Sequence, residues 1–175
     1  MYFAIEGVIG VGKTTLARLL QPQFDAELVL EVFEENPFLS NFYADRARYA
    51  FQTQIFFLLS RYHQQRRNIG DRLSQVKALI SDYTFEKDRL FAQINLYGDE
   101  LDMHYKVQEA LAEKIIAPDL VVYLRASTDT LMKRIAMRDR PYERQMDRDY
   151  IDLVNRAYDA FYFNSPHLTN ILTID

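Results

Sequence analysis

Short apolar runs alternate with longer stretches of helical periodicity along this chain. The apolar runs predict strands at residues 1–6, 27–33, 76–80, 120–124 and 170–174. Between them, the spacing of apolar side chains predicts helices at residues 14–20, 47–67, 85–95, 99–116, 127–137 and 149–163. Strands without a polar face are typical of parallel sheets covered by helices on both sides. The pattern therefore predicts an α/β fold, with a mostly parallel sheet of about five strands flanked by helices.

Length and composition limit the class of protein. A chain of 175 residues suits one domain, at residues 1–175, with a sizeable core. The net charge of −4 disfavours a nucleic-acid partner, because general nucleic-acid binders usually carry a basic surface. No apolar run reaches membrane-spanning length, so we expect no membrane partner. The chain has no cysteine and its first predicted strand begins at the N-terminus, which together favour a cytoplasmic location.

The link between the first strand and the first helix carries the strongest motif. Residues 7–15 read Gly-Val-Ile-Gly-Val-Gly-Lys-Thr-Thr, which fits the phosphate-binding loop G-x-x-x-x-G-K-[ST]. A chance match is the alternative, and the order strand, loop, helix disfavours it. We expect Lys13 to reach the β- and γ-phosphates of ATP and Thr14 to offer its hydroxyl to Mg²⁺. The expected phosphate-binding residues of this P-loop kinase fold are Gly7, Gly10, Val11, Gly12, Lys13, Thr14 and Thr15.

Two carboxylates lie at or just after the carboxyl ends of predicted strands, where open α/β sheets place their ligands. Glu31 lies near the end of the second strand and could accept the proton of an attacking hydroxyl. Asp82 follows the third strand and could hold Mg²⁺ through water or polarise a substrate hydroxyl. The alternatives are a solvated acidic segment around Glu31 and a helix cap at Asp82.

Polar residues within two predicted helices are further candidates. Gln54 and Arg61 share one face of an otherwise apolar helix, so the Gln54 amide needs a partner there. A nucleobase edge is one such partner, and neighbouring backbone is the other. Arg134 and Arg138 lie one turn apart, with Arg140 after them. Clustered arginines can neutralise a phosphoryl group in transfer, and a solvated basic helix face is the alternative.

Taken together, these motifs resemble those of the deoxynucleoside kinase family, in particular its bacterial deoxyguanosine/deoxyadenosine kinase type. The likeness covers nearly the whole chain and rests on residues 7–15, 31, 36–39, 43, 54, 61, 81–83 and 134–143. The resemblance implies ATP-dependent phosphorylation of the 5′-hydroxyl of a purine deoxynucleoside, deoxyguanosine or deoxyadenosine, in nucleotide salvage. Mg²⁺ is the implied cofactor, held by Thr14 with Glu31 or Asp82 contacting it through water.

The resemblance also implies roles for individual residues. Glu31 resembles the family's strand-end glutamate, which is usually taken as the base, and Asp82 resembles an acid that is sometimes given that role. Both remain candidates, and we prefer Glu31 because its strand end suits the nucleoside side of the cleft. Lys13 and Arg138 complete the implied catalytic set. The implied substrate-binding residues are Glu31, Tyr43 (sugar 3′-hydroxyl), Gln54 (base edge), Arg61 and Asp88 (around the base), Tyr83, and Glu143 (sugar). The implied lid arginines over the ATP phosphates are Arg134, Arg138 and Arg140.

Two features depart from the family pattern. Tyr83 stands where many relatives have arginine, so we expect Arg138 or another lid arginine to supply that charge. The chain stops at Asp175, whereas relatives continue, and we expect a C-terminal adenine-contacting loop and helix to be missing. The early end of the chain keeps open one alternative, a non-catalytic nucleotide-binding partner subunit of a related kinase. A thymidylate-kinase-like nucleoside monophosphate kinase is a second alternative, which Tyr83 in place of that arginine disfavours. The apolar surface of the helices at 47–67 and 99–116 predicts a homodimer, or a heterodimer with a related kinase.

Overall fold

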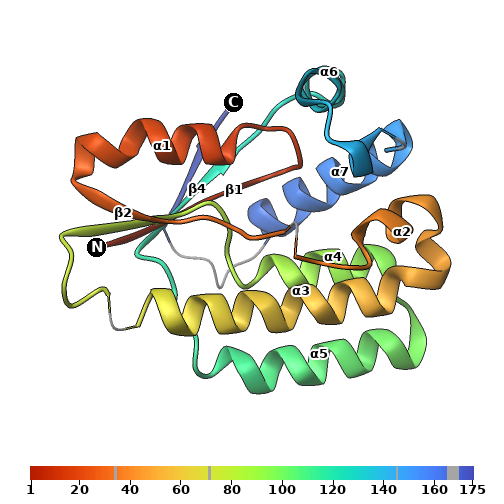
Figure 1. Cartoon of the computed structure of the whole chain (residues 1–175), viewed down its shortest axis with the longest axis horizontal. Helices are drawn as coiled ribbons and strands as arrows, with labels where there is room; N and C mark the ends of the chain where they lie inside the picture. Colours follow the sequence, from red (N-terminus) through yellow and green to blue (C-terminus); the bar gives the residue numbers. More distant parts are fainter. Residues whose placement is uncertain (34, 71, 145, 165–169) are drawn as a thin grey trace.

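A parallel β-sheet forms the centre of the molecule (Figure 1). The computed structural model describes residues 1–33, 35–70, 72–144, 146–164 and 170–175, and these ranges contain five strands. The strands are β1 (Tyr2–Gly7), β2 (Ala26–Val29), β3 (Ala78–Ser81), β4 (Leu120–Leu124) and β5 (Ile171–Ile174). They lie in the order β2-β3-β1-β4-β5, and each neighbouring pair is parallel. The predicted α/β fold with a parallel sheet of about five strands is confirmed.

Strand β1 lies between β3 and β4, and the order of the strands reverses beside it. In open α/β sheets, ligands bind outside the carboxyl ends of the strands at such a reversal. The ends of β1 and β3 are therefore the expected floor of a ligand site, and both are followed by motifs identified in the sequence.

Helices cover both faces of the sheet. Figure 1 shows α1 on one side and α3, α4, α5 and α7 on the other, with α5 farthest from the sheet. The helices of the described ranges are α1 (Lys13–Phe24), α2 (Leu39–Ala44), α3 (Arg46–Asn68), α4 (Lys87–Asn95), α5 (Gly98–Ala112), α6 (Thr128–Arg138), a short 3₁₀ helix η1 (Pro141–Glu143) and α7 (Arg148–Asn164). None of the helices in this described part is long and apolar enough to cross a membrane.

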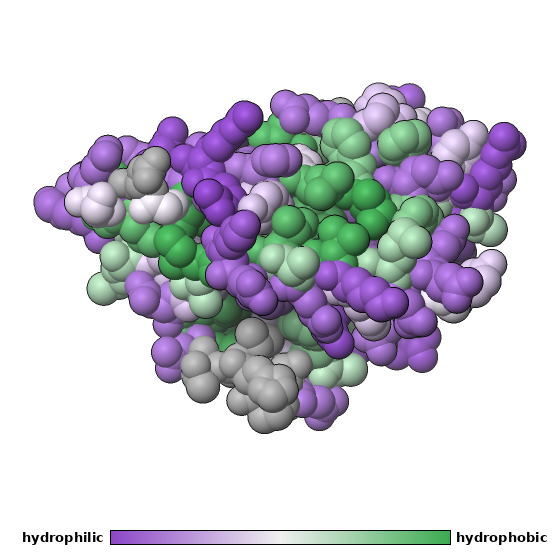
Figure 2. Space-filling model, turned by 90° about the horizontal axis from the view of Figure 1, so that it is seen from below, coloured by the Kyte–Doolittle hydropathy of each residue, from purple (hydrophilic) through white to green (hydrophobic). Residues whose placement is uncertain are grey.

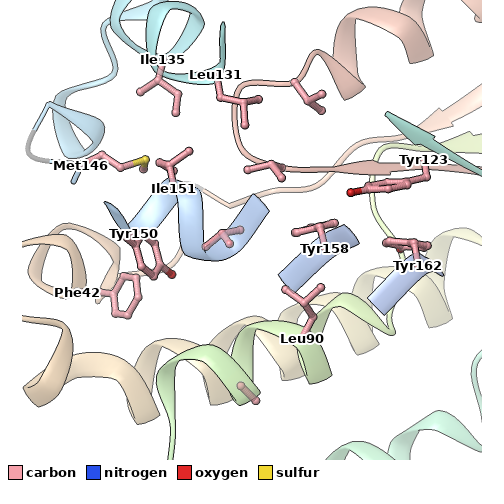
Figure 3. Packing of buried hydrophobic residues seen from close by; sticks show 14 of the residues in the cluster. Phe42, Leu90, Tyr123, Leu131, Ile135, Met146, Tyr150, Ile151, Tyr158 and Tyr162 are labelled. Carbon is pink, nitrogen blue, oxygen red and sulfur yellow. The ribbon is translucent and has the colours of Figure 1, made fainter. Parts of the chain in front are cut away.

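The largest core cluster joins α7 to the sheet, to α4 and to α6 (Figure 3). Tyr123 of β4 stacks on Tyr162 of α7 with ring centroids 4.6 Å apart, and Tyr158 stacks beside them. Leu131 and Ile135 bring α6 against the phosphate-loop side of the same cluster. The core therefore fixes α6, which carries Arg134 and Arg138, relative to the phosphate loop.

Element boundaries differ from the prediction in ways that matter for the site. Strand β2 ends at Val29, although the apolar run continues to Phe33. Its partner β3 ends at Ser81, which is paired with Val29, so the residues after Val29 have no neighbour with which to continue the ladder. Glu31 consequently lies on an extended segment beyond the sheet. Helix α2, which shapes one wall of the site, was not predicted, and α5 ends at Ala112, before the predicted end at 116.

Candidate active site

The phosphate loop connects β1 to α1 and curls tightly against β4 and α6. Gly7 and Gly10 have φ angles of +144° and +86°, which side chains rarely adopt. A Cβ at Gly7 would lie 2.4 Å from the carbonyl oxygen of Leu124, so both conformation and space require glycine there. The Lys13 ammonium donates to the carbonyl oxygens of Gly7 (2.7 Å) and Val8 (3.2 Å). Lys13 thus lies across its own loop, where an incoming phosphate would compete for it.

Lys13 is strongly affected by its surroundings. Burial, followed by repulsion from Lys87, lowers the pKa of Lys13 from 10.5 to about 8. A phosphate bound between the two ammonium groups would remove this repulsion and stabilise the charged form of Lys13.

Asp82 connects the phosphate loop to the segment that carries Glu31. Its Oδ2 accepts a hydrogen bond from the Thr14 hydroxyl (2.5 Å), and its Oδ1 accepts one from the backbone N–H of Glu31 (2.7 Å). The carboxylate therefore fixes the strand-end segment against the start of α1. Since both oxygens are engaged, Asp82 is well placed to hold the two halves of the site together.

Glu31 is held between two cations. Its Oε1 accepts hydrogen bonds from Arg61 Nε (2.8 Å) and Nη2 (2.5 Å), and its Oε2 accepts one from Lys87 Nζ (2.8 Å). Burial alone would raise the pKa of Glu31, but the charges and hydrogen bonds of Arg61 and Lys87 outweigh it and hold the pKa well below its usual range. Arg61 also pairs with the fully buried Asp88. Glu31 is consequently a fixed, ionised hydrogen-bond acceptor facing the cavity.

The apolar end of the cavity contains Gln54. Its side chain is buried, and within the described residues its Oε1 has no hydrogen-bond partner. Phe57 and Phe91 line the same cavity, and the Arg61 guanidinium lies 4.6 Å from the centre of the Phe57 ring. Flat apolar walls around an unpaired amide oxygen suit a planar ligand that carries N–H donors.

The end of α6 and the residues after it close the opposite side of the cavity. Arg138 Nε donates to Glu143 Oε2 (2.6 Å), and the Arg140 guanidinium lies over the ring of Phe33, 4.2 Å from its centre. Tyr142 stacks nearly parallel to Tyr43, with centroids 6.5 Å apart. Aromatic contacts and one buried carboxylate thus hold the arginine-bearing segment over the cavity.

Most of the predicted site residues line one cavity. Those that do are Gly7, Gly10, Lys13, Thr14, Glu31, Tyr43, Gln54, Arg61, Asp82, Arg138, Arg140 and Glu143. Asp88 lies behind Arg61, and Arg134 lies outside the lining, where it donates to the carbonyl oxygen of Val11 (2.7 Å). Gly12 directly precedes α1, and Thr15 is exposed. None of these four residues lines the cavity.

Tyr83 requires a correction. The sequence suggested that it contacts the substrate, but it is fully buried and packs with Tyr2, Val29, Ile69 and Leu79 in a separate core cluster. Neighbouring residues after β3 point in opposite directions, so when Asp82 faces the cavity Tyr83 faces the core. Tyr83 therefore does not line the cavity.

Two buried charged residues were missed by the sequence analysis. Glu6, at the end of β1, accepts hydrogen bonds from the backbone N–H groups of Gly7 (3.1 Å) and Thr84 (2.6 Å) and from the Tyr158 hydroxyl (3.2 Å). Lys87 lines the cavity and contacts Glu31. A charged residue inside an apolar strand was a signal available for Glu6. Lys87 stands in a charged segment that reads equally well as exposed, so only the fold could identify it.

The site has oxygen donors suited to a magnesium ion. The Thr14 hydroxyl and the Asp82 carboxylate lie within hydrogen-bonding distance of each other, and both are hard oxygen ligands. Across the described ranges, no cluster of three or more histidine, aspartate or glutamate side chains could hold a metal ion. Any Mg²⁺ here would therefore take its remaining ligands from phosphate oxygens and water.

Comparisons with known proteins agree with this geometry. The family model described as deoxynucleoside kinase matches residues 3–175. A deoxyguanosine kinase of Bacillus subtilis (strain 168) is 34% identical over 178 residues, covering 99% of this chain and 86% of that protein. A deoxyadenosine kinase of Dictyostelium discoideum is 32% identical, covering 91% of this chain and 66% of that protein. The solved structure of deoxyadenosine kinase from M. mycoides with bound dCTP has a TM-score of 0.87 at 27% identity, covering 100% of this chain and 90% of that one.

Proposed function

The chain belongs to the deoxynucleoside kinase family and is a kinase, and from that premise we propose that it transfers the γ-phosphoryl group of ATP to the 5′-hydroxyl of deoxyguanosine or deoxyadenosine in nucleotide salvage. One observation carries the proposal. Asp82 bonds both to Thr14 of the phosphate loop and to the backbone of Glu31, so a phosphate site and a fixed carboxylate share one cavity. We further propose that the enzyme works in the cytoplasm, where ATP is available.

The residues of this chain divide the reaction between them. Glu31 accepts the hydrogen bond, and finally the proton, of the 5′-hydroxyl, which orients that oxygen toward the γ-phosphorus. Its low basicity is compatible with a loose transition state, because proton removal need not precede formation of the new phosphorus–oxygen bond. Lys13, Arg138 and Arg140 surround the phosphate side with positive charge.

Mg²⁺ is the cofactor that we propose. Thr14 would hold it directly, with Asp82 contacting it through water, and Glu31 is committed to its two cations. When bound, the ion would offset the negative charge of the ATP phosphates.

The preference for a purine is proposed from the relatives, which are named deoxyguanosine kinase and deoxyadenosine kinase. Gln54 supports binding of a base at this end of the cavity, because its unpaired Oε1 needs an N–H donor. Leaving this buried oxygen unpaired would cost about 1–3 kcal/mol.

The direct test is ATP consumption with Mg²⁺ and each of the four common deoxynucleosides in turn. We expect turnover with deoxyguanosine or deoxyadenosine, together with ³¹P or mass-spectrometric detection of the 5′-monophosphate. Turnover only with a deoxynucleoside monophosphate would indicate the monophosphate kinase alternative. Intact ATP binding without turnover of any acceptor would indicate a nucleotide-binding partner subunit.

We also propose that the enzyme is a dimer formed through α3 and α5. Leu59 of α3 and Met103 of α5 are 40% and 55% exposed. Figure 2, which views the molecule from the side of α5, shows hydrophobic residues gathered on this face. Sedimentation at micromolar concentration should give the mass of a dimer, and Leu59→Glu combined with Met103→Glu should shift it to the monomer. A clean monomer mass for the unmodified chain would rule this dimer out.

A further inference from the structure

Lys87 occupies an unfavourable position for a lysine. Its side chain is only 5% exposed, and it is the first residue of α4. The N-terminal end of a helix carries partial positive charge, so a cation there is repelled, and burial adds a desolvation cost. Stability alone does not explain such a residue, because a buried ion pair is often no better than an apolar pair of similar volume. The burial of Lys87 at this position therefore indicates a functional role.

The contacts of Lys87 concentrate on Glu31. Its ammonium nitrogen lies 2.8 Å from Glu31 Oε2, and across the described ranges this carboxylate is its one ion-pair partner. Arg61, on the other side of Glu31, divides its guanidinium between Glu31 and Asp88. The two cations thus differ, because Arg61 ties Glu31 to the base end of the cavity, whereas Lys87 is dedicated to Glu31.

Lys87 also lies at the boundary between the two halves of the cavity. It lines the same cavity as Lys13, and the charges of the two lysines repel each other, which contributes to the lowered pKa of Lys13. Arg138 makes its charge-assisted hydrogen bond to Glu143 in this structure and not to Glu31. Residue 83 supplies no cation here either, because it is a tyrosine and is buried in the core. Lys87 is therefore the cation that joins the acceptor carboxylate to the phosphate loop.

We propose that Lys87 is a positioning residue for phosphoryl transfer, which holds Glu31 Oε2 so that the carboxylate presents a free lone pair to the 5′-hydroxyl. The inference rests on the proposed function and assigns a role within it. During transfer the phosphorus–oxygen bond to ADP breaks, a bond from phosphorus to the 5′-oxygen forms, and the hydroxyl proton passes to Glu31. Lys87 keeps Glu31 in the orientation in which it can take that proton.

The test compares Lys87→Met and Lys87→Arg in the full chain, with ATP, Mg²⁺ and the preferred purine deoxynucleoside. We expect Lys87→Met to lower kcat about 100-fold while leaving the KM for ATP within about threefold, because the misplaced group is the acceptor base and not the phosphate site. Lys87→Arg keeps the cation and should recover at least about tenfold of that loss. Arg89→Met is the matched control, because Arg89 is in the same helix and pairs with Glu109 on the outside of the molecule. It should leave kcat within about twofold.

A double-mutant cycle separates positioning from a structural role. If Lys87 acts through Glu31, then Lys87→Met should cost less than about threefold in kcat when Glu31 is already glutamine. An equal loss in both backgrounds would show that Lys87 does not act through Glu31 and would overturn the inference. Thermal unfolding and ATP binding of each variant identify a folding defect. If Lys87→Met has such a defect, the kcat of Lys87→Arg tests the positioning role instead.

The proposed function and this inference fail in different ways. A wild-type chain without phosphorylation of any deoxynucleoside overturns the proposed function and this role for Lys87 with it. Normal wild-type turnover with an unaffected Lys87→Met variant overturns the inference alone.

Discussion

The acceptor side and the lid side of the cavity both carry clustered charges, but they bury them to different degrees. On the acceptor side, the side chains of Glu31, Arg61, Lys87 and Asp88 are 13%, 6%, 5% and 0% exposed. On the lid side, Arg138 and Arg140 are 32% and 35% exposed, and both approach the buried Glu143. Each acceptor-side charge is paired with another inside the protein, although Asp88 Oδ2 has no hydrogen-bond partner among the described residues. The lid arginines retain contact with solvent.

This difference indicates two ways of preparing a site. Buried, mutually bonded charges keep one geometry, so the acceptor side is organised before the substrate arrives. Partly exposed arginines can exchange a carboxylate for phosphate oxygens at modest cost, so we expect Arg138 and Arg140 to change partners when ATP binds. We therefore expect substitutions on the acceptor side to act mainly on kcat and those on the lid side to act mainly on ATP.

Glu31→Gln breaks the acceptor side most directly and should have the largest effect. The amide keeps the shape of Glu31 but cannot take the hydroxyl proton, so we expect kcat to fall about 1,000-fold. ATP binding, measured by calorimetry, should remain close to the wild-type value because the phosphate loop is untouched. Near-normal turnover in this variant would move the base role to Asp82.

Arg138→Met tests the lid side and should have a smaller effect. We expect kcat/KM for ATP to fall about 100-fold, because one cation facing the phosphates is lost. The KM for the deoxynucleoside should change by less than about threefold. Arg144→Met is the matched control, since Arg144 follows η1 and pairs with the exposed Asp139. A rise in the deoxynucleoside KM without a change for ATP would contradict the division between the two sides.

The comparison also shows which parts of the site could be predicted from the sequence. The phosphate loop could be predicted because its glycines and lysine are close in the chain and form a local motif through their backbone geometry. Glu31 and Asp82 were readable because the ends of parallel strands converge at one edge of the sheet. The parallel sheet followed from apolar runs that need cover on both faces.

Other features depend on contacts between distant residues and could not be predicted. The early end of β2 depends on where β3 ends, and the inward direction of Tyr83 depends on the outward direction of Asp82. Lys87 reads as a surface residue until α4 is packed with its first turn against Glu31. Charge burial is a tertiary property, so the sequence could single out Glu31 as a candidate acceptor carboxylate but not the Lys87 ammonium that contacts it.

Gln54→Leu sharpens the comparison within the acceptor side, because we propose that Gln54 contacts the base and not the reacting hydroxyl. We expect the KM for the preferred deoxynucleoside to rise about 30-fold, since the leucine cannot accept a hydrogen bond from the base edge. The kcat at saturation should fall by less than about fivefold. Gln52→Leu on the exposed side of α3 is the control and should leave both constants unchanged. Equal losses in kcat and in kcat/KM would place Gln54 in the transition state instead.

Tyr83→Phe should have the smallest effect on the kinetic constants. It tests whether Tyr83, the residue after Asp82, belongs to the acceptor side of the cavity. Within the described residues the buried Tyr83 hydroxyl has no hydrogen-bond partner, so removing it relieves an unsatisfied polar group. We expect the free energy of unfolding to rise by up to about 1 kcal/mol, and both kinetic constants to stay within about twofold. Denaturant unfolding and steady-state kinetics measure the two quantities. A tenfold rise in the KM for the deoxynucleoside, without a change in stability, would contradict this assignment. It would indicate that Tyr83 contacts the substrate, because a ring that only packs in the core should affect stability before it affects affinity.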